Sequence, residues 1–238
     1  MNTLWTFGDS FTSDLNYTNL HDNYKKYFEI TNTDKIVTWP TILGEMLNMN
    51  IKNLALGGSS NYDTFQSICN NSDLFRENDV VVIGWGLIGK FRIARGSEFI
   101  SIFPDINNVN DIESISKETI IEFIENRLIQ FDSKRDRYSE EIHIWENIIR
   151  TLSRNKKFKV YFWTSEEERF LNEKTSIHIK KENYLFPNVN KPIMNYLRND
   201  LNCKTIFHET NGVISDSHFG NEGHKLQAEI FYNIIKNG

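Results

Sequence analysis

Two polar motifs near opposite ends of the chain contain the side chains that could carry out acyl transfer. Gly8-Asp9-Ser10 supplies a hydroxyl, and Asp216-Ser217-His218 supplies an imidazole with a carboxylate two residues away. A neutral imidazole can take the proton of a serine hydroxyl and so make it a nucleophile. A carboxylate on the other ring nitrogen fixes the tautomer and stabilises the imidazolium. The residue types therefore predict Ser10 as nucleophile, His218 as base and Asp216 as the group that orients the base.

Gly8-Asp9-Ser10 taken alone is as typical of a turn or a helix cap as of a catalytic site. Its position favours chemistry, because the apolar run at 4–7 predicts a strand that ends at Gly8. A serine just past the carboxyl end of a strand in an open α/β sheet lies in the crevice where ligands bind. Asp9 is expected to bond the backbone of the turn rather than to take part in the chemistry.

The elements that must position these motifs alternate between strands and helices. Strands are predicted by apolar runs at 4–7, 51–56, 80–85, 157–164 and 204–208. Helices are predicted at 41–47, from Ser60 or Asn61 to about 70, in two successive stretches within 117–155, at 191–199 and at 222–236. This alternation predicts a mostly parallel sheet with helices on both faces. The last strand would place His218 at the same edge of the sheet as Ser10.

Three segments lack a clean period, near 12–36, 87–116 and 165–190. They are expected to be insertions in a single domain that spans residues 1–238, since no linker rich in Pro or Gly divides the chain. Within the second segment, residues 91–96 and 99–103 could pair as a hairpin or form a lid.

The composition is that of a globular protein with an acidic balance. Hydrophobic residues make up 39% of the chain, and the formal net charge is −5. The negative charge argues against nucleic acid or an anionic membrane surface as a partner. There is no run of about 18 apolar residues that could span a membrane. The strand predicted from residue 4 leaves no room for a signal peptide, so a cytoplasmic location is expected.

The cysteines and most histidines give no sign of a metal site. Cys69 and Cys203 lack metal-type spacing and are expected to be reduced thiols. Histidines without nearby Cys or carboxylate spacing stand at positions 21, 143, 178 and 208. No metal and no cofactor are therefore expected. The lack of Gly-x-Gly-x-x-Gly or P-loop spacing also argues against a nucleotide-binding protein.

The order of the motifs resembles the GDSL or SGNH hydrolases, a family of esterases and acylhydrolases. The resemblance covers the chain from residue 4 to about 230 and implies a flavodoxin-like three-layer α/β/α sandwich. It also implies that Ser10 is the nucleophile, His218 the base and Asp216 its partner. The resemblance further implies an oxyanion hole, which the Ser10 N–H, the Gly58 N–H and an Asn side chain could build here.

Two positions depart from the family's pattern. The usual last motif would need a carboxylate at position 215, where the chain has Ser215, so the Asp216–His218 spacing is one residue tighter. The third motif, Gly-x-Asn-Asp, falls on Gly84-Trp85-Gly86-Leu87 and lacks the oxyanion Asn. Loss of one such donor costs about 3 kcal/mol of transition-state stabilisation. Asn61, close to Gly58, is the expected replacement.

Two further side chains near these motifs have more than one interpretation. Trp85 is either a core residue or a substrate-binding platform for a sugar ring. His224 is expected to be structural, with the role of the base as its alternative.

The sequence as a whole predicts a serine hydrolase that cleaves a carboxylic ester through an acyl-enzyme, with an O-acetyl ester on a carbohydrate as the candidate substrate. The alternative is a weakly active or inactive carbohydrate-binding or assembly protein of the same fold, which the missing third-motif Asn favours. The retained Ser10, Asp216 and His218 oppose that alternative.

Overall fold

The computed structural model describes residues 1–15, 22–86, 91–95, 98–102, 116–165, 183–186, 193–203, 209–210, 213–214 and 218–237. Several sequence predictions lie outside these residues. They are the strand at 204–208, the orienting carboxylate Asp216, most of the irregular segments at 87–116 and 165–190, and the histidines at 21, 178 and 208.

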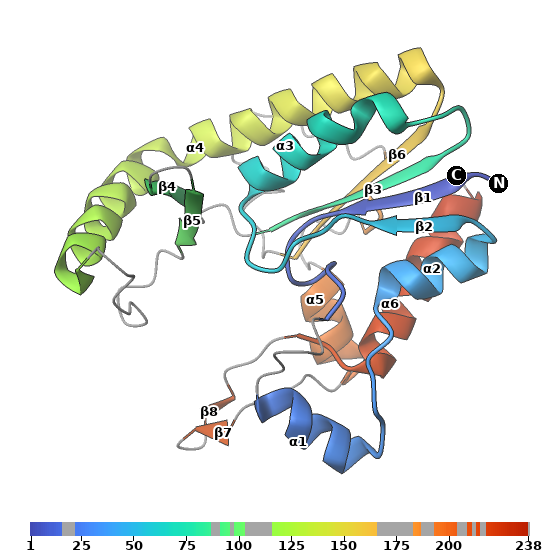
Figure 1. The fold of residues 1–238 in the computed structure, drawn as a ribbon, viewed down its shortest axis with the longest axis horizontal. Helices are drawn as coiled ribbons and strands as arrows, with labels where there is room; N and C mark the ends of the chain where they lie inside the picture. The colour runs from blue at the N-terminus through green and yellow to red at the C-terminus, as the bar shows by residue number, and fades with distance from the viewer. Residues whose placement is uncertain are drawn as a thin grey trace.

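A parallel four-stranded sheet forms the centre of the fold (Figure 1), in the order β2-β1-β3-β6. Its strands are β1 (Thr3–Phe7), β2 (Asn50–Asn53), β3 (Val80–Trp85) and β6 (Lys159–Thr164). All three strand pairings are parallel, as the alternation of strands and helices predicts. Beyond β6, Phe162 forms a parallel bridge with Tyr184, so the segment 183–186 lies where a further strand would add to the sheet.

Helices cover both faces of the sheet, and the predicted three-layer α/β/α arrangement is confirmed (Figure 1). On one face lie α2 (Trp39–Leu47) and α6 (Asn221–Asn237), and on the other lie α3 (Asn61–Asn71) and α4 (Lys117–Lys156). The remaining elements are α1 (Asp22–Thr31), η2 (Ser72–Leu74), β4 (Phe91–Arg95), β5 (Glu98–Ile102), α5 (Ile193–Asn195), η4 (Tyr196–Asp200), β7 (Glu209–Thr210) and β8 (Val213–Ile214).

Several elements differ in extent from their predictions. The two helical stretches expected within 117–155 form one continuous helix of 40 residues. β2 ends at Asn53 rather than at 56, although the Leu54 and Leu56 N–H groups continue to bond the β1 side, at Thr6 O and Gly8 O. β4 and β5 pair antiparallel, which is the hairpin alternative for this segment. No helix in the described part of the chain is both long enough and apolar enough to cross a membrane.

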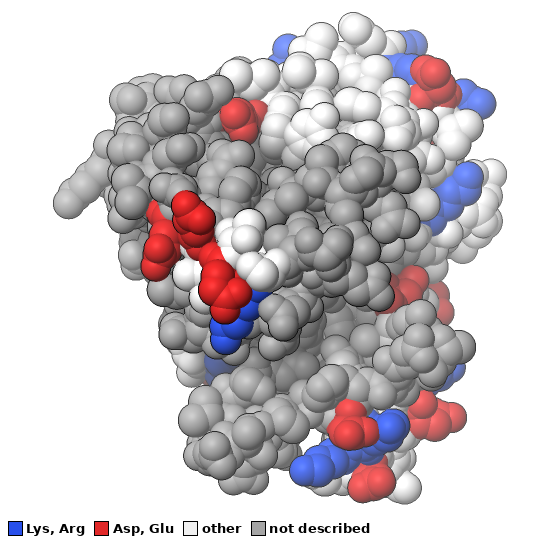
Figure 2. Space-filling view, turned by 60° about the vertical axis from the view of Figure 1, so that its left-hand side comes forward, with Lys and Arg blue, Asp and Glu red and all other residues white. Residues whose placement is uncertain are grey.

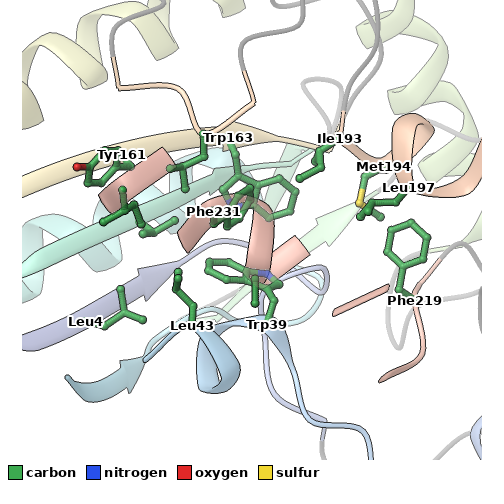
Figure 3. Packing of buried hydrophobic residues seen from close by; sticks show 14 of the residues in the cluster. Leu4, Trp39, Leu43, Tyr161, Trp163, Ile193, Met194, Leu197, Phe219 and Phe231 are labelled. Carbon is green, nitrogen blue, oxygen red and sulfur yellow. The ribbon is translucent and has the colours of Figure 1, made fainter. Parts of the chain in front are cut away.

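Alternate side chains of the buried strands enter two separate cores. Toward α2 and α6, the rings of Trp39, Trp163 and Phe231 pack together, with centroids 5.1 to 6.0 Å apart (Figure 3). Toward α3 and α4, the strands contribute Trp5, Phe7, Val81, Ile83, Trp85, Val160 and Phe162. Strands covered on both faces read as unbroken apolar runs, which is why β3 was readily predicted from the sequence.

The described charged side chains form no extended basic surface on the face drawn in Figure 2. On the face shown in Figure 2, the described basic side chains lie beside acidic ones, most clearly at the lower end, where Figure 1 places α1. In α1, Lys25 Nζ lies 2.8 Å from Asp22 Oδ1, and both side chains are exposed. Exposed ion pairs of this kind contribute little to stability.

Candidate active site

The hydroxyl and the imidazole predicted to act together are in hydrogen-bond contact. Ser10 Oγ lies 2.8 Å from His218 Nε2, although the two residues are 208 positions apart in the sequence. Both side chains are partly exposed, so the pair is open to a ligand. Ser10 follows the carboxyl end of β1 and His218 precedes α6, as the parallel topology requires. The predicted proximity is confirmed.

A tight turn after β1 presents Ser10 to the surface. Gly8 has a φ of +153°, and a Cβ at this position would lie 2.7 Å from Thr12 Oγ1, so glycine is required here. The Asp9 carbonyl accepts hydrogen bonds from the N–H groups of Thr12 (3.0 Å) and Ser13 (2.9 Å). Asp9 Oδ1 accepts a bond from the Phe11 N–H at 3.1 Å. Asp9 therefore bonds the turn, the role that the sequence indicated.

Phe11 packs against the His218 imidazole. Its ring stacks on His218, with centroids 4.6 Å apart and planes inclined by 25°. The Phe11 carbonyl in turn accepts a hydrogen bond from Trp39 Nε1 at 3.0 Å. This contact was not predictable, because no spacing in the sequence relates Phe11 to a histidine 207 positions away. Asp216 lies outside the described residues, so its bond to His218 stays a prediction.

The loop after β2 lies against Ser10. A Cβ at Gly57 would lie 4.0 Å from Ser10 Cβ, and Gly58 has a φ of +84°, which glycine adopts without strain. Ser59 Oγ donates to the Gly8 carbonyl at 3.1 Å and ties the loop to the turn after β1. Within the described part of the chain, the N–H groups of Ser10 and Gly58 make no hydrogen bond. These N–H groups are thus available to an incoming oxygen.

At the end of β3, Gly86 stands at the position where the family resemblance would place an oxyanion Asn. Asn61 Oδ1 accepts from the Gly86 N–H at 2.8 Å, and Asn61 Nδ2 donates to the Gly86 carbonyl at 3.1 Å. A Cβ at Gly86 would lie 2.4 Å from Asp9 Oδ2, so the Asp9 carboxylate occupies the space that a side chain there would need. Both ends of the Asn61 amide hold Gly86, which was not predicted. An oxyanion role for Asn61 stays a prediction. Because one Nδ2 hydrogen already bonds the Gly86 carbonyl, only the second Nδ2 hydrogen could serve as the donor.

Trp85 and His224 both belong to the buried part of the molecule. The Trp85 side chain is only 1% exposed and its Nε1 donates to Glu146 Oε1 at 3.0 Å. The proposal of Trp85 as a sugar platform is therefore wrong, because its ring faces the core between β3 and α4 and no face is accessible. His224 Nδ1 accepts a hydrogen bond from the Trp39 N–H at 3.3 Å. Burial, and secondarily the charge of His218, lowers the pKa of His224 to about 4, as suits a neutral structural residue.

The described residues define an α/β protein with a serine–histidine pair at the carboxyl edge of its parallel sheet. No protein-family model and no curated protein sequence matches the chain. Among solved structures, it is similar to a G-D-S-L family protein from Desulfitobacterium hafniense DCB-2, with 14% identity, a TM-score of 0.35 and coverage of 98% of this chain and 99% of that chain.

The chain is also similar to protein YXIM from Bacillus subtilis, with 13% identity and a TM-score of 0.43, over 99% of this chain and 56% of that chain. The Desulfitobacterium protein bears the name of the family that the sequence motifs resemble. At these identities and TM-scores, neither likeness bears on what this chain does.

Proposed function

We propose that the protein is a serine hydrolase of the GDSL or SGNH type that cleaves a carboxylic ester through an acyl-enzyme. The observation that carries this proposal is the 2.8 Å contact between Ser10 Oγ and His218 Nε2 at the carboxyl edge of the sheet. A neutral imidazole at this distance is within reach of the hydroxyl proton. The location, at the edge where open α/β sheets bind ligands, supports the same reading.

In the proposed reaction, Ser10 Oγ attacks the ester carbonyl carbon while its proton passes to His218 Nε2. The carbonyl oxygen becomes an oxyanion, which the N–H groups of Ser10 and Gly58 stabilise. The tetrahedral intermediate then collapses: the bond to the alcohol oxygen breaks, and the imidazolium gives its proton to the leaving alkoxide. Water, deprotonated by the same imidazole, attacks the acyl-enzyme and releases the acid and Ser10. Asp216 is proposed to orient the imidazole throughout.

For the substrate, we propose an acetyl ester on a carbohydrate. The chain has no long apolar segment of the kind that a lipid-binding cleft would need, which favours a short acyl group and a polar alcohol. With Trp85 buried, any sugar would have to contact other side chains at the sheet edge.

Labelling with a fluorophosphonate probe tests the reaction type directly. The wild-type protein should be labelled on Ser10, as located by peptide mass spectrometry, and Ser10→Ala should lose all labelling. Ser13→Ala is the matched control, because Ser13 lies in the same turn and is also partly exposed. Labelling that persists in Ser10→Ala, or that is absent from a folded wild-type protein, would rule out Ser10 as an activated nucleophile.

A second candidate function is a carbohydrate-binding or assembly protein that keeps the fold without turnover. The observation that favours it is the Asp9 carboxylate beside Gly86, which fills the space of the expected oxyanion Asn. The two functions separate in one set of measurements. A folded protein that binds an acetylated sugar by calorimetry, yet neither hydrolyses it nor reacts with the probe, would be the binding protein.

A further inference from the structure

A buried carboxylate lies behind the candidate active site, on α4. Glu146 is 2% exposed, and two donors from different elements converge on its Oε1 atom. Trp85 Nε1 donates at 3.0 Å from the end of β3, and the Tyr184 hydroxyl donates at 2.5 Å from the segment beside β6. Arg150, one turn further along α4, places Nη2 3.6 Å from Glu146 Oε2. A carboxylate buried this completely must be paired and hydrogen-bonded, and here it is both.

A series of contacts connects this carboxylate to the loop that lies beside Ser10. The Trp85 indole is bonded to Glu146, and the next residue, Gly86, is bonded through its N–H and its carbonyl to Asn61. Asn61 is the first residue of α3 and follows directly on the loop that contains Gly58. That loop is the proposed source of one oxyanion donor.

The end of β3 has little room to move at Gly86. A Cβ there would lie 2.4 Å from Asp9 Oδ2, so the backbone of Gly86 runs directly against the residue that precedes Ser10. A shift of the end of β3 would therefore move either Asp9 or Asn61. Displacements on the order of 1 Å in a catalytic site can cost about a hundredfold in rate.

We propose that Glu146 is a positioning residue, which holds the end of β3 through Trp85 and so fixes the Gly58 loop relative to Ser10. Its influence on rate rests on the proposed hydrolase function, whereas its influence on the loop does not. Because the contact is made through the Trp85 indole, removal of that N–H should affect the loop even when Glu146 stays in place.

The central variant is Trp85→Phe, and two matched controls separate the possible causes of its effect. Tyr184→Phe removes the other donor to the same carboxylate oxygen but is not on the route to Gly86. Trp163→Phe removes the same indole volume from the neighbouring strand β6, where the Trp163 Nε1 has no hydrogen-bond partner in the described structure. All three should lose some thermal stability.

In hydrolysis of a p-nitrophenyl ester, Trp85→Phe should lower kcat by about tenfold with KM nearly unchanged, because the oxyanion contact strengthens only in the transition state. Both controls should keep kcat within about threefold of wild type on the same principle. Hydrogen exchange of the peptide that covers residues 57–61 should become faster in Trp85→Phe alone. Equal losses of kcat and equal exchange in Trp85→Phe and Trp163→Phe would overturn the proposal, since lost volume would then explain both.

Two further comparisons keep the test decisive. If Trp85→Phe does not fold, two variants of Glu146 replace it. Glu146→Gln keeps an oxygen for the indole N–H, whereas Glu146→Met does not. Faster hydrogen exchange at 57–61 only in Glu146→Met supports the proposal, and equal exchange in both variants contradicts it.

Ser10→Ala in the p-nitrophenyl ester assay separates the proposed function from the role of Glu146. Hydrolysis that survives Ser10→Ala removes the proposed function, whereas hydrolysis that depends on Ser10 but is indifferent to Trp85→Phe, with unchanged exchange, removes only the role of Glu146.

Discussion

On each face of the sheet, a buried titratable side chain contacts a buried tryptophan that leads to the candidate site. On the α4 face, Glu146 accepts from the Trp85 indole, and Trp85 precedes Gly86. On the α6 face, His224 accepts from the Trp39 backbone N–H, and the Trp39 indole donates to the Phe11 carbonyl.

Burial pushes both groups toward their neutral forms, but their surroundings differ. For Glu146, burial raises the pKa, while the Tyr184 hydroxyl, the Arg150 charge and the Trp85 N–H act to lower it. For His224, burial lowers the pKa to about 4, and the charge of His218 acts in the same direction. One face therefore surrounds its buried carboxyl group with donors that partly offset burial, whereas the other face depends on a neutral ring.

The largest expected effect is on the α4 face. Glu146→Ala would leave Arg150, which is 7% exposed, without its carboxylate and would leave the Trp85 N–H and the Tyr184 hydroxyl unpaired. Loss of one member of a buried ion pair costs about 3–5 kcal/mol. Urea denaturation at neutral pH measures the change in the free energy of unfolding. A loss below 1 kcal/mol would mean that water or rearrangement replaces the carboxylate, and the contrast between the faces would fail.

The α6 face should instead be sensitive to acid. The pKa of His224 falls from 6.5 to about 4 on folding, so the unfolded chain binds more protons between these values. The stability contributed by the neutral ring is therefore complete above pH 6.5 and is lost as the pH falls toward about 4. The loss amounts to about 3 kcal/mol.

Urea titrations at pH 7 and pH 4.5 measure this loss, and His224→Gln is the control because its amide cannot titrate. The difference between the two pH values should be smaller in His224→Gln than in wild type. The same pH dependence in both proteins would assign the acid sensitivity to other groups.

The smallest effect concerns Gly86, where the end of β3 meets the turn that contains Ser10. Gly86→Ala places a methyl group 2.4 Å from Asp9 Oδ2, and overpacking of this kind costs about 1–3 kcal/mol. Gly58→Ala is a useful comparison because a Cβ there meets nothing within 4 Å, so any loss reflects its φ of +84° alone. Thermal unfolding of both variants shows which substitution loses more stability. A Gly86→Ala protein as stable as wild type would show that Asp9 moves aside readily.

The parts of this site that follow from strand order were predictable, and the parts that follow from side-chain packing were not. Ser10 and His218 could be paired from the sequence, because carboxyl ends of parallel strands meet at one edge. The role of Asn61 as an oxyanion donor stays a prediction, and its two bonds to Gly86 were not predictable, since a sequence does not say which backbone groups an amide side chain meets. Trp85 was left undecided because a strand's last residue can face either the core or the crevice.

Glu146 was missed, although a signal for it was present. It lies four residues after Ile142 and three before Ile149, so it shares the helix face that these buried residues occupy. A carboxylate within an apolar stripe is a marker of a buried polar network. In a helix this rich in Glu, Lys and Arg, however, the charge of a single residue does not stand out from the solvated face.

The separation of 208 residues between Ser10 and His218 has a consequence for the time at which the site can form. A ribosome adds about 5–20 residues per second, so Ser10 is synthesised on the order of 10–40 s before its partner. The contact also has high sequence separation, which slows the final step of folding. While the residues between them are being added, the Ser10 hydroxyl lacks its contact with His218, and that contact forms only when α6 joins the sheet. Chemistry at this site would report that folding is complete.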